Sequence, residues 1–505
     1  MSTQRRSRAK SRNTTLSAIV ANDKSLAIVE ETIVPIAESS RVSTRPLSSH
    51  SVVHNDNDCT TVEKVPFKPG KWRKSMSMLR SSICRLDGSC SIAGERRITL
   101  YTSDHHVSQA TNATMQRDTV RSSISKQPDD DNDVPVHQFV APLVWRTVAE
   151  QRYLCPKSPR NEILARCGQQ GPISFERALA SLEAVVDRKI GEGVYGEVFL
   201  CTKATGLQSV LKLIPIEGNL LINDTKQKTY EQILSEVIIS AELSNLRQHN
   251  VQFSTDGFVE LLSVHCLVGR YPQRLIDLWE EYDNKHGTEN DSPKEFPAEQ
   301  LYIAFETAFG GTDLDGYRFR NAQQAFSIYT QIVLMLAVAE KRYDFEHRDL
   351  HTGNILIEPT KEPERTYYLL GEEIVIQTHG LKATIIDYTL SYIVYNGLCL
   401  FNDLTTDEEL FTAEGDYQFE VYRNMKLALK NEWNLHAPKT NVYWLHYLLD
   451  KLISVRNYRD KTSKPHKAAM KTMKELMDVL LRFNSVYEIV SHYFVPQLNE
   501  SDKEN

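Results

Sequence analysis

The sequence predicts an α+β fold of two lobes, a small β-rich N-lobe and a mainly helical C-lobe, preceded by a disordered N-terminal region. Three observations support this: a glycine-rich turn between two strands, a lone lysine in an apolar strand, and a buried helix before a polar loop. The first residues are rich in Ser, Thr, Asn and Arg without sustained periodicity, which predicts disorder. We expect disorder at 1–140, an extension packing on the fold at 141–173, the N-lobe and hinge at 174–310, the C-lobe at 311–497 and a tail at 498–505.

The stretch from Ile190 to Phe199 predicts a strand, a glycine-rich turn and a second strand. Glycines with G-x-G-x-x-G spacing let backbone amides close over phosphate oxygens. A dinucleotide-binding turn has the same spacing but needs a helix directly after it, whereas this chain continues with β-branched and aromatic residues. The pattern therefore favours the nucleotide loop of a protein kinase. The residues expected to bind nucleotide here are Ile190, Gly191, Glu192, Gly193, Val194, Tyr195, Gly196 and Val198.

Lys212 lies inside the apolar run 210–214, where an unpaired ammonium group would be costly. By itself it would be better explained as a lysine that reaches solvent from a strand edge. The segment 230–246 has helical spacing of its apolar residues and carries Glu236 where a kinase presents the partner of this lysine. We therefore predict an ion pair between Lys212 and Glu236, with both residues at the nucleotide.

The segment from His347 to Asn354 has the H-R-D-L-x-x-x-N arrangement of a protein-kinase catalytic loop. Asp349 would accept the proton of an incoming hydroxyl group, and Asn354 would hold a metal ion. An apolar strand further along ends in Asp387, which matches the second metal-binding aspartate. These residues predict a protein-kinase-like fold that uses ATP and Mg²⁺. These motifs occur in the order of a protein kinase, which strengthens the prediction because a single motif match can arise by chance.

Two departures from the usual kinase pattern follow Asp387. The triplet is Asp-Tyr-Thr, in which β-branched Thr389 replaces a glycine and stiffens the backbone, and no Ala-Pro-Glu sequence follows. An ordinary flip of the activation loop is therefore not expected. We predict activity without phosphorylation of that loop.

With these departures the chain resembles the haspin family, atypical kinases that phosphorylate the histone H3 tail. The resemblance covers residues 163–495, including the insert 358–383 between catalytic loop and metal aspartate. The matching segments are 191–199, 236–240, 309–314, 347–351, 385–391, 415–419 and 444–447. It implies that backbone groups of a hinge bind adenine, that Asp313 binds ribose and that His351 hydrogen-bonds near the reacting hydroxyl group. Thr307 stands where the family usually has a large aromatic residue. The hinge residues implied are Glu306, Ala308, Phe309 and Gly310.

The segment 401–420 carries seven acidic residues and no Lys or Arg. Without context, a solvated acidic face is the better explanation of such a run. The resemblance instead implies a groove that attracts a basic tail. It assigns Asp407, Glu409 and Asp416 to the first residues of the peptide, and Asp315, with Asp349, to the lysine after the target threonine. Asp315 replaces the usual Glu of the family.

The expected function is serine/threonine phosphorylation of histone H3 near its N-terminus, with a role in mitotic or meiotic chromosome segregation. The alternatives are a kinase with a different basic substrate and a silent pseudokinase that binds histone tails. The expected partners are the H3 tail and chromatin, in the nucleus and on chromosomes, with a cytoplasmic pool. Residues 1–140 hold 20 Lys and Arg against 15 Asp and Glu, and the rest 39 against 51. The basic run 5–12 suggests weak contact with DNA or an import factor, although such runs more often have no specific role.

The eight cysteines form no C-x-x-C pair and no cluster with histidine, so neither a zinc site nor a disulfide framework is predicted. The N-terminus lacks the apolar segment of a secretory signal. The longest apolar run, around 332–339, is far shorter than a membrane span. We therefore expect an intracellular protein without a membrane contact.

Overall fold

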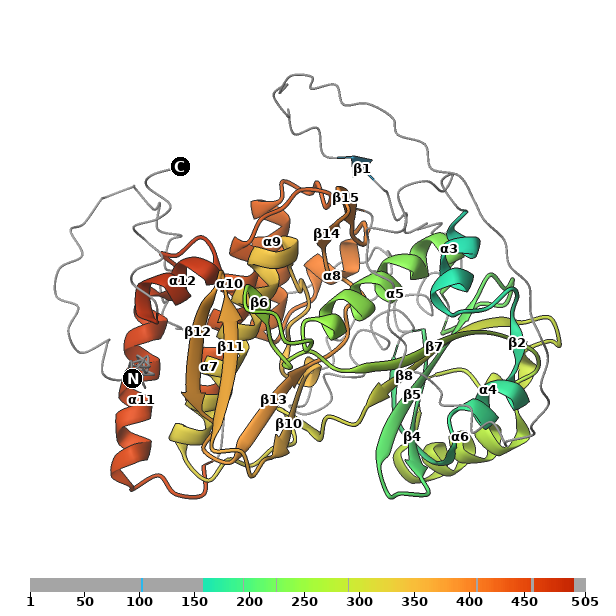
Figure 1. Ribbon diagram of the computed structural model, residues 1–505, viewed down its shortest axis with the longest axis horizontal. Helices are drawn as coiled ribbons and strands as arrows, with labels where there is room; N and C mark the ends of the chain where they lie inside the picture. Colours follow the sequence, from blue (N-terminus) through green and yellow to red (C-terminus); the bar gives the residue numbers. More distant parts are fainter. Residues whose placement is uncertain are drawn as a thin grey trace, which may run out of the picture.

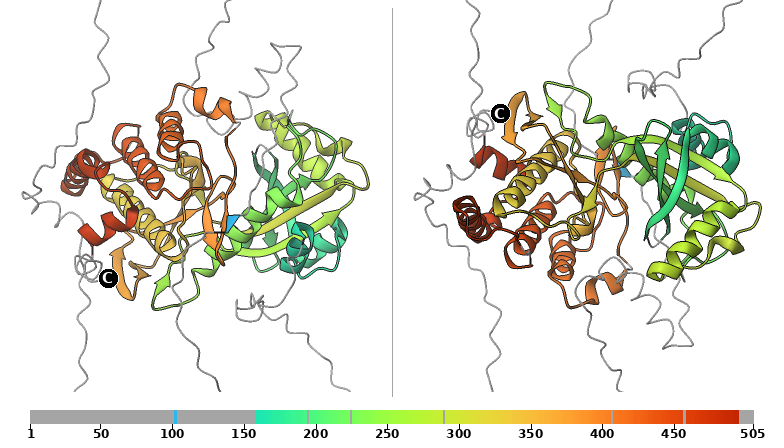
Figure 2. Two further views of the ribbon diagram at one scale, coloured as in Figure 1. Left: turned by 90° about the horizontal axis from the view of Figure 1, so that it is seen from above. Right: turned by 90° about the horizontal axis from the view of Figure 1, so that it is seen from below.

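The computed structural model describes residues 158–494, apart from residues 194, 224, 289, 406, 456 and 457, together with the strand β1 (Tyr101–Thr102). The chain forms a small β-rich lobe and a larger, mainly helical lobe, which lie side by side (Figure 1, Figure 2). This confirms the predicted fold class. The disorder predicted for 1–140 and the tail at 498–505 fall outside the described residues, except for β1.

The small lobe is built on a six-stranded sheet with the order β2-β7-β8-β5-β4-β3. Neighbouring strands are antiparallel except β2 and β7, which are parallel. The strands are β2 (Ile173–Ser174), β3 (Ala184–Gly193), β4 (Gly196–Lys203), β5 (Gln208–Ile216), β7 (Leu261–Val268) and β8 (Leu301–Ala308).

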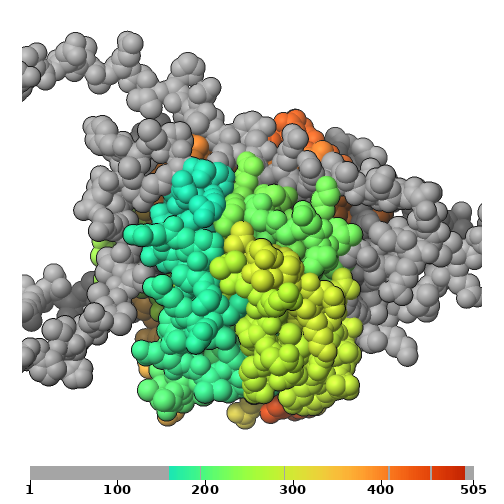
Figure 3. Space-filling view, turned by 90° about the vertical axis from the view of Figure 1, so that its right-hand side faces the viewer, coloured from blue at the N-terminus to red at the C-terminus, as the bar shows by residue number. Residues whose placement is uncertain are grey.

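Alternating side chains of β8 enter two different hydrophobic clusters. Ile303 and Phe305 pack with the helix α5 (Tyr230–Asn245), whereas Tyr302 and Ala304 pack with the helix α6 (Gln273–His286). Because successive side chains of a strand point to opposite faces, α5 and α6 cover opposite faces of the sheet. In Figure 3 the first part of the small lobe, in teal, lies beside the yellow-green region of α6.

The helix predicted at 230–246 is α5, which begins with a capping box made by Thr229 and Gln232. Such a box satisfies two backbone N–H groups that have no partner in the helix. The helix α3 (Pro159–Arg166), part of the expected extension, packs against α5. The remaining short helices of this lobe are α4 (Phe175–Ser181) and η3 (Pro293–Glu295).

The central helix of the large lobe is α7 (Ala322–Tyr343), which contains the predicted buried helix before the catalytic loop. By length and composition α7 could cross a membrane, but most of it is buried inside the lobe. Among the described residues it is the one helix that passes this test. The other helices are η4 (Thr352–Asn354), α8 (Glu408–Thr412), α9 (Tyr417–Ala428), α10 (Lys439–Asp450), the π-helix η5 (Lys451–Val455), α11 (Lys464–Leu480) and α12 (Val486–Tyr493).

Three small sheets complete the large lobe, of which one has the order β1-β15-β14. Another has the order β13-β10-β9. In it β9 follows the hinge, β10 follows the catalytic loop and β13 leads to Asp387. The third contains most of the expected insert 358–383, as the hairpin β11-β12 extended by β6. The strands are β6 (Phe253–Ser254), β9 (Thr312–Asp313), β10 (Ile355–Pro359), β11 (Glu364–Leu369), β12 (Glu372–Gln377), β13 (Leu381–Ile385), β14 (Ile393–Tyr395) and β15 (Leu398–Leu400).

Candidate active site

Lys212 on β5 and Glu236 on α5 form the predicted ion pair. The lysine Nζ lies 2.8 Å from Glu236 Oε1 and 3.7 Å from Asp387 Oδ2. The site therefore joins a strand and a helix of the small lobe to the chain that follows β13 in the large lobe. This prediction from the sequence is confirmed.

The charges in this group stabilise one another. Burial alone would lower the pKa of Lys212, but Asp387 and Glu236 outweigh burial and hold it above its ordinary value. Burial alone would raise the pKa of Asp387, yet Lys212 and hydrogen bonds from Thr389 hold it well below its usual range. Both groups are consequently charged at neutral pH, ready to meet phosphate and a metal ion.

Asp349 follows the buried end of α7 and is held by two different elements. Its Oδ1 accepts a short hydrogen bond from the hydroxyl group of Tyr422 on α9, and its main-chain carbonyl accepts one from Asn354 Nδ2 at 2.8 Å. Burial raises the pKa of Asp349 to about 6, against the opposing effects of His351 and Tyr422. A carboxylate with this pKa is ionised at pH 7 and is a better proton acceptor than an ordinary aspartate.

Tyr422 was not found by sequence reasoning. It is 73 positions from Asp349 along the chain, and no motif links the two. His351, the predicted neighbour of the reacting hydroxyl group, caps η4, where its Nδ1 accepts a hydrogen bond from Gly353 N at 3.0 Å. Because this bond uses Nδ1, the predicted hydrogen bond near the reacting hydroxyl group would have to use the other ring nitrogen, Nε2.

The Asp-Tyr-Thr triplet is held in one conformation. Asp387 has a left-handed backbone (φ 63°), and its Oδ1 accepts a hydrogen bond from Thr389 N at 3.1 Å. The ring of Tyr388 is buried among Phe258, Phe345 and His347, and its hydroxyl group donates to Ile385 O. A flip of this segment would expose the ring and break these bonds.

Asn354 and Asp387 are suited to hold Mg²⁺. Asn354 is nearly fully buried, and its Nδ2 donates to the Asp349 carbonyl, which leaves its amide oxygen for a metal ion. Asp387 supplies an ionised carboxylate. Magnesium in such sites is bound through one or two protein oxygens, substrate phosphates and water. The described residues contain no cluster of three or more His, Cys, Asp or Glu that could hold a metal by itself.

The glycine-rich turn has the space that phosphate requires. A Cβ built on Gly191 or Gly193 would meet nothing closer than 3.9 Å, so neither glycine is needed for internal packing. Gly196 is different, because its Cβ would lie 2.0 Å from Leu213 O. Val194 lies outside the described residues. The Glu192 carboxylate pairs with Lys189 Nζ at 2.7 Å, so its predicted nucleotide contact rests on backbone atoms.

The register of β5 and β8 orients the side chains of the hinge. Lys212 pairs with Phe305 and Val210 with Thr307, so Thr307 lies on the same face of the sheet as Lys212. Leu211 pairs with Glu306, which places the Glu306 side chain on the opposite face, where its Oε2 accepts a bond from Ser263 Oγ at 3.0 Å. Any contact of Glu306 with adenine must therefore use its backbone.

The chain after the hinge lies against β10. A Cβ on Gly310 would come within 2.8 Å of Leu356 Cδ1, and one on Gly311, at φ 96°, within 2.3 Å of Ile357 O. Leu356 also pairs with Asp313, the predicted ribose ligand. Leu356 is thus a further residue beside the predicted adenine site that sequence reasoning missed. Ala308 ends β8, and half-exposed Phe309 follows it.

The predicted substrate acids do not have equal surroundings. Asp416 caps α9 through Gln418 N and forms a short ion pair with Lys451, so both carboxylate oxygens have partners. Asp315 Oδ1 accepts a bond from Thr352 Oγ1 at 2.7 Å. The pKa of the Tyr447 hydroxyl group is raised, mainly by burial and next by the charge of Asp416. Asp315 raises this pKa further, whereas hydrogen bonds with Thr352 lower it.

Asp407 acts electrostatically on Tyr422, the residue that donates to Asp349. Burial and Asp349 raise the pKa of Tyr422, with smaller contributions from Tyr447 and Asp407. The Glu409 side chain lies outside what the structure describes. The substrate roles of these four acids stay predictions.

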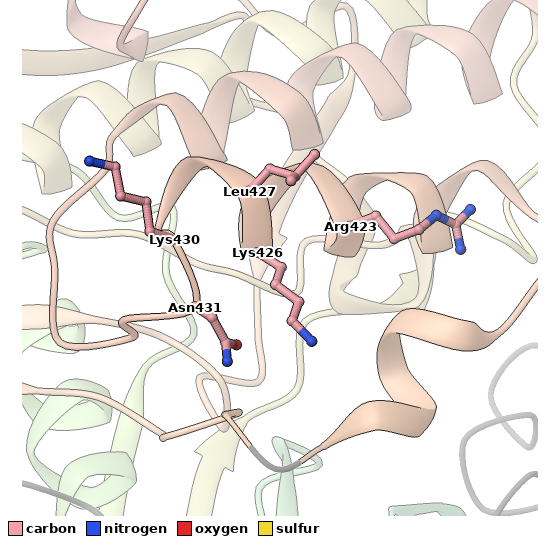
Figure 4. A pocket seen from close by; sticks show the side chains of 5 residues that line it. All are labelled: Arg423, Lys426, Leu427, Lys430 and Asn431. Atoms are coloured by element: carbon pink, nitrogen blue, oxygen red, sulfur yellow. The ribbon is translucent and has the colours of Figure 1, made fainter. Parts of the chain in front are cut away.

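A basic pocket lies at the far end of α9 from Asp416 (Figure 4). Arg423 pairs with Glu420, and Lys426 lies over the ring of Phe411. Cations are favoured at a helix C-terminus by the helix dipole. The pocket contains none of the predicted nucleotide residues. The residues that line it are Arg423, Lys426, Leu427, Lys430 and Asn431.

Comparison with known proteins gives a consistent result. The model of the haspin-like kinase domain matches residues 107–490, beginning inside the segment expected to be disordered. The chain is 42% identical to a serine/threonine-protein kinase haspin homolog of Drosophila melanogaster over 339 residues, 66% of this chain and 60% of that protein. It is 41% identical to serine/threonine-protein kinase haspin of Mus musculus over 358 residues, 70% of this chain and 47% of that protein. An Arabidopsis thaliana haspin homolog is 38% identical over 342 residues, 66% of this chain and 55% of that protein.

The chain thus spans about half the length of these relatives. The family model covers most of the large and small lobes, including Lys212, Asp349 and Asp387. The protein belongs to the haspin-like kinase family.

Proposed function

We propose that this protein is an active serine/threonine kinase that transfers the γ-phosphate of ATP to a threonine near the N-terminus of histone H3. Its setting would be chromosomes in the nucleus during mitosis or meiosis. The observation that supports catalysis best is the assembled group of Lys212, Glu236 and Asp387, with 2.8 and 3.7 Å between charged atoms. A silent binding module would have no need to hold the buried Glu236 carboxylate against this lysine, because a buried charge is costly unless it is paired.

The chain's residues account for each part of the transfer. Lys212, held by Glu236, would bind phosphate oxygens, and Asn354 and Asp387 would hold Mg²⁺, which neutralises charge on the phosphates. The threonine oxygen would attack the γ-phosphorus in line as the bond to the bridging oxygen breaks and ADP leaves. The hydroxyl proton would pass to Asp349, whose pKa of about 6 leaves it ionised at neutral pH.

The support for a histone tail comes from charge and from the family. One acid of this run, Asp407, acts electrostatically on Tyr422, which donates a hydrogen bond to the base Asp349. Negative charge beside a catalytic base attracts a cationic peptide and orients it. Asp416 is engaged by Lys451, so an arriving basic residue would have to exchange with that lysine. We therefore expect this ion pair to reduce what Asp416 contributes to peptide affinity.

The test measures phosphate incorporation by mass spectrometry into an H3 N-terminal peptide with a free or an acetylated first amine. Wild-type protein should modify the threonine near the N-terminus, and acetylation should reduce this. Asp349→Asn should abolish it while Mg·ATP still binds. Asp407→Asn should raise the KM for peptide but not for ATP, whereas Glu432→Gln, at an exposed site, should change neither.

The other outcomes point to the alternatives. Transfer to other basic peptides but not to H3 would show that the protein is a kinase with a different basic substrate. Binding of the H3 peptide without transfer to any substrate, in protein that does not bind Mg·ATP, would favour a silent binding module.

A further inference from the structure

Glu236 has two lysine partners. Its Oε1 is bound by Lys212, and its Oε2 by the Nζ of Lys228 at 2.9 Å. The Lys228 side chain is 8% exposed and the Glu236 side chain 5%. Hydrogen bonds between two charged groups are stronger than those between neutral groups. Removing one partner of a buried pair leaves the other charge uncompensated. Lys228 therefore contacts the same glutamate as Lys212, although no motif identified it.

The position of Lys228 is set by the sheet, not by α5. It lies just before the helix cap Thr229, and its main-chain carbonyl accepts a hydrogen bond from Glu217 N at 3.0 Å. It also forms a parallel bridge with Ile216 at the end of β5. Lys228 therefore connects β5, which carries Lys212, to the second turn of α5, which carries Glu236.

The same ammonium group contacts the glycine-rich turn. Lys228 Nζ lies 4.8 Å from the centroid of the Tyr195 ring, and Tyr195 is itself buried. A cation at this distance from an aromatic ring is attracted by it, more strongly where water is excluded. The tip of the phosphate loop is thus packed on the residue that also binds Glu236.

The second lysine also balances the charge of the site. Lys212 and Lys228 face two carboxylates, Glu236 and Asp387, and Lys228 contributes to the lowered pKa of both. With Lys212 alone, buried Glu236 and partly exposed Asp387 would share one cation until a metal ion bound. These two lysines and two carboxylates instead balance one another before nucleotide and metal arrive.

We propose that Lys228 is a second positioning lysine, which holds Glu236 through its other carboxylate oxygen and ties it to the phosphate loop through Tyr195. In this arrangement α5 and the glycine-rich turn stay in their catalytic positions without bound nucleotide. The inference rests on the proposed nucleotide chemistry, but not on the identity of the protein substrate.

The test compares Mg·ATP binding to full-length variants, with a fluorescent ATP analogue as the probe. Lys228→Met should raise the Kd by about 10- to 100-fold, the effect of losing a hydrogen bond between charged groups. Lys228→Arg keeps the charge and should restore most of the affinity. Lys226→Met, at an exposed position two residues away, is the matched control and should bind like wild type.

A double-mutant cycle separates positioning from general destabilisation. In a Lys212→Met background, Lys228→Met should add little, because Lys228 acts on the nucleotide only through Glu236 and the lysine that Glu236 holds. An equal loss in both backgrounds, or unchanged affinity in folded Lys228→Met, would overturn the proposal. If Lys228→Met does not fold, Tyr195→Leu should bind Mg·ATP more weakly than Tyr195→Phe, and equal binding by these two would overturn it. Wild-type protein that binds Mg·ATP without modifying H3 would reject the histone proposal alone.

Discussion

Arg348 and Glu346 form a buried ion pair with two parallel hydrogen bonds, in which Nε and Nη2 each lie 3.1 Å from a carboxylate oxygen. The guanidinium group also donates to the carbonyls of Trp433 and Leu435 at 2.7 Å. Neither charged side chain has exposed surface. In kinases that are switched on by phosphorylation, new pairs between arginine and phosphate order the activation loop. Arg348, next to the catalytic Asp349, is not available for such a pair.

The first prediction is that phosphatase treatment leaves the activity unchanged. Arg348 is already paired and Tyr388 is buried among aromatic rings, so the structure has no evident use for a loop phosphate. The measurement compares kcat of treated and untreated full-length protein, with mass spectrometry to verify that phosphate was removed. Protein that is silent until its loop is phosphorylated would contradict this account.

A second prediction distinguishes two glycines of the phosphate loop. Gly196→Ala should lower the melting temperature, because its Cβ would lie 2.0 Å from a β5 carbonyl oxygen. Gly193→Ala has room and should keep the melting temperature, but its methyl group should raise the KM for ATP. Thermal unfolding and steady-state kinetics on both variants test this. Equal melting temperatures in the two variants would show that the close approach at Gly196 is not structural.

Local patterns predicted much of the fold and the catalytic groups. The helices at α5 and α7, the strands around the glycine-rich turn and the Lys212–Glu236 pair follow from periodicity and from motif order. Each depends on residues close in sequence, or on a pairing that the kinase pattern specifies. Such features are therefore visible in a single sequence.

Other features depend on three-dimensional relations that no local pattern encodes. Tyr422 meets Asp349 only because α9 packs beside the catalytic loop. The orientation of Glu306 follows from strand register, and a shift of one residue would reverse it. Asp416 belongs to an acidic run without Lys or Arg, and its partner Lys451 lies 35 positions away. Lys228 lies in a polar segment before α5, and its contact with Glu236 appears only in the folded structure.

A third prediction concerns acid stability. His347 is fully buried, and burial lowers its pKa from 6.5 to about 4. Its folded form is therefore neutral, whereas the unfolded chain binds a proton below about pH 6.5. Stability from this residue is present above pH 6.5 and is lost as the pH falls toward 4. Between pH 7 and 5 the loss should be about 2 kcal/mol.

Urea unfolding at pH 7 and pH 5 measures this. His347→Gln cannot titrate, so its stability should fall less than that of wild type over the same interval. His286→Gln, at an exposed position on α6, should leave the wild-type difference unchanged. An undiminished pH dependence in His347→Gln would assign the effect to other groups.

The last prediction concerns the space behind adenine. Thr307 lies on the same face of β8 as Phe305, which pairs with Lys212. We therefore expect the size of the Thr307 side chain to limit how far a ligand can reach toward Lys212. Thr307→Phe should leave the KM for ATP nearly unchanged and weaken an ATP-competitive inhibitor that carries a bulky group there. The cost of such overpacking, about 1–3 kcal/mol, corresponds to about 5- to 150-fold in potency. The matched inhibitor without the bulky group should inhibit both proteins alike, and equal potency of the bulky compound on both would place Thr307 away from the pocket.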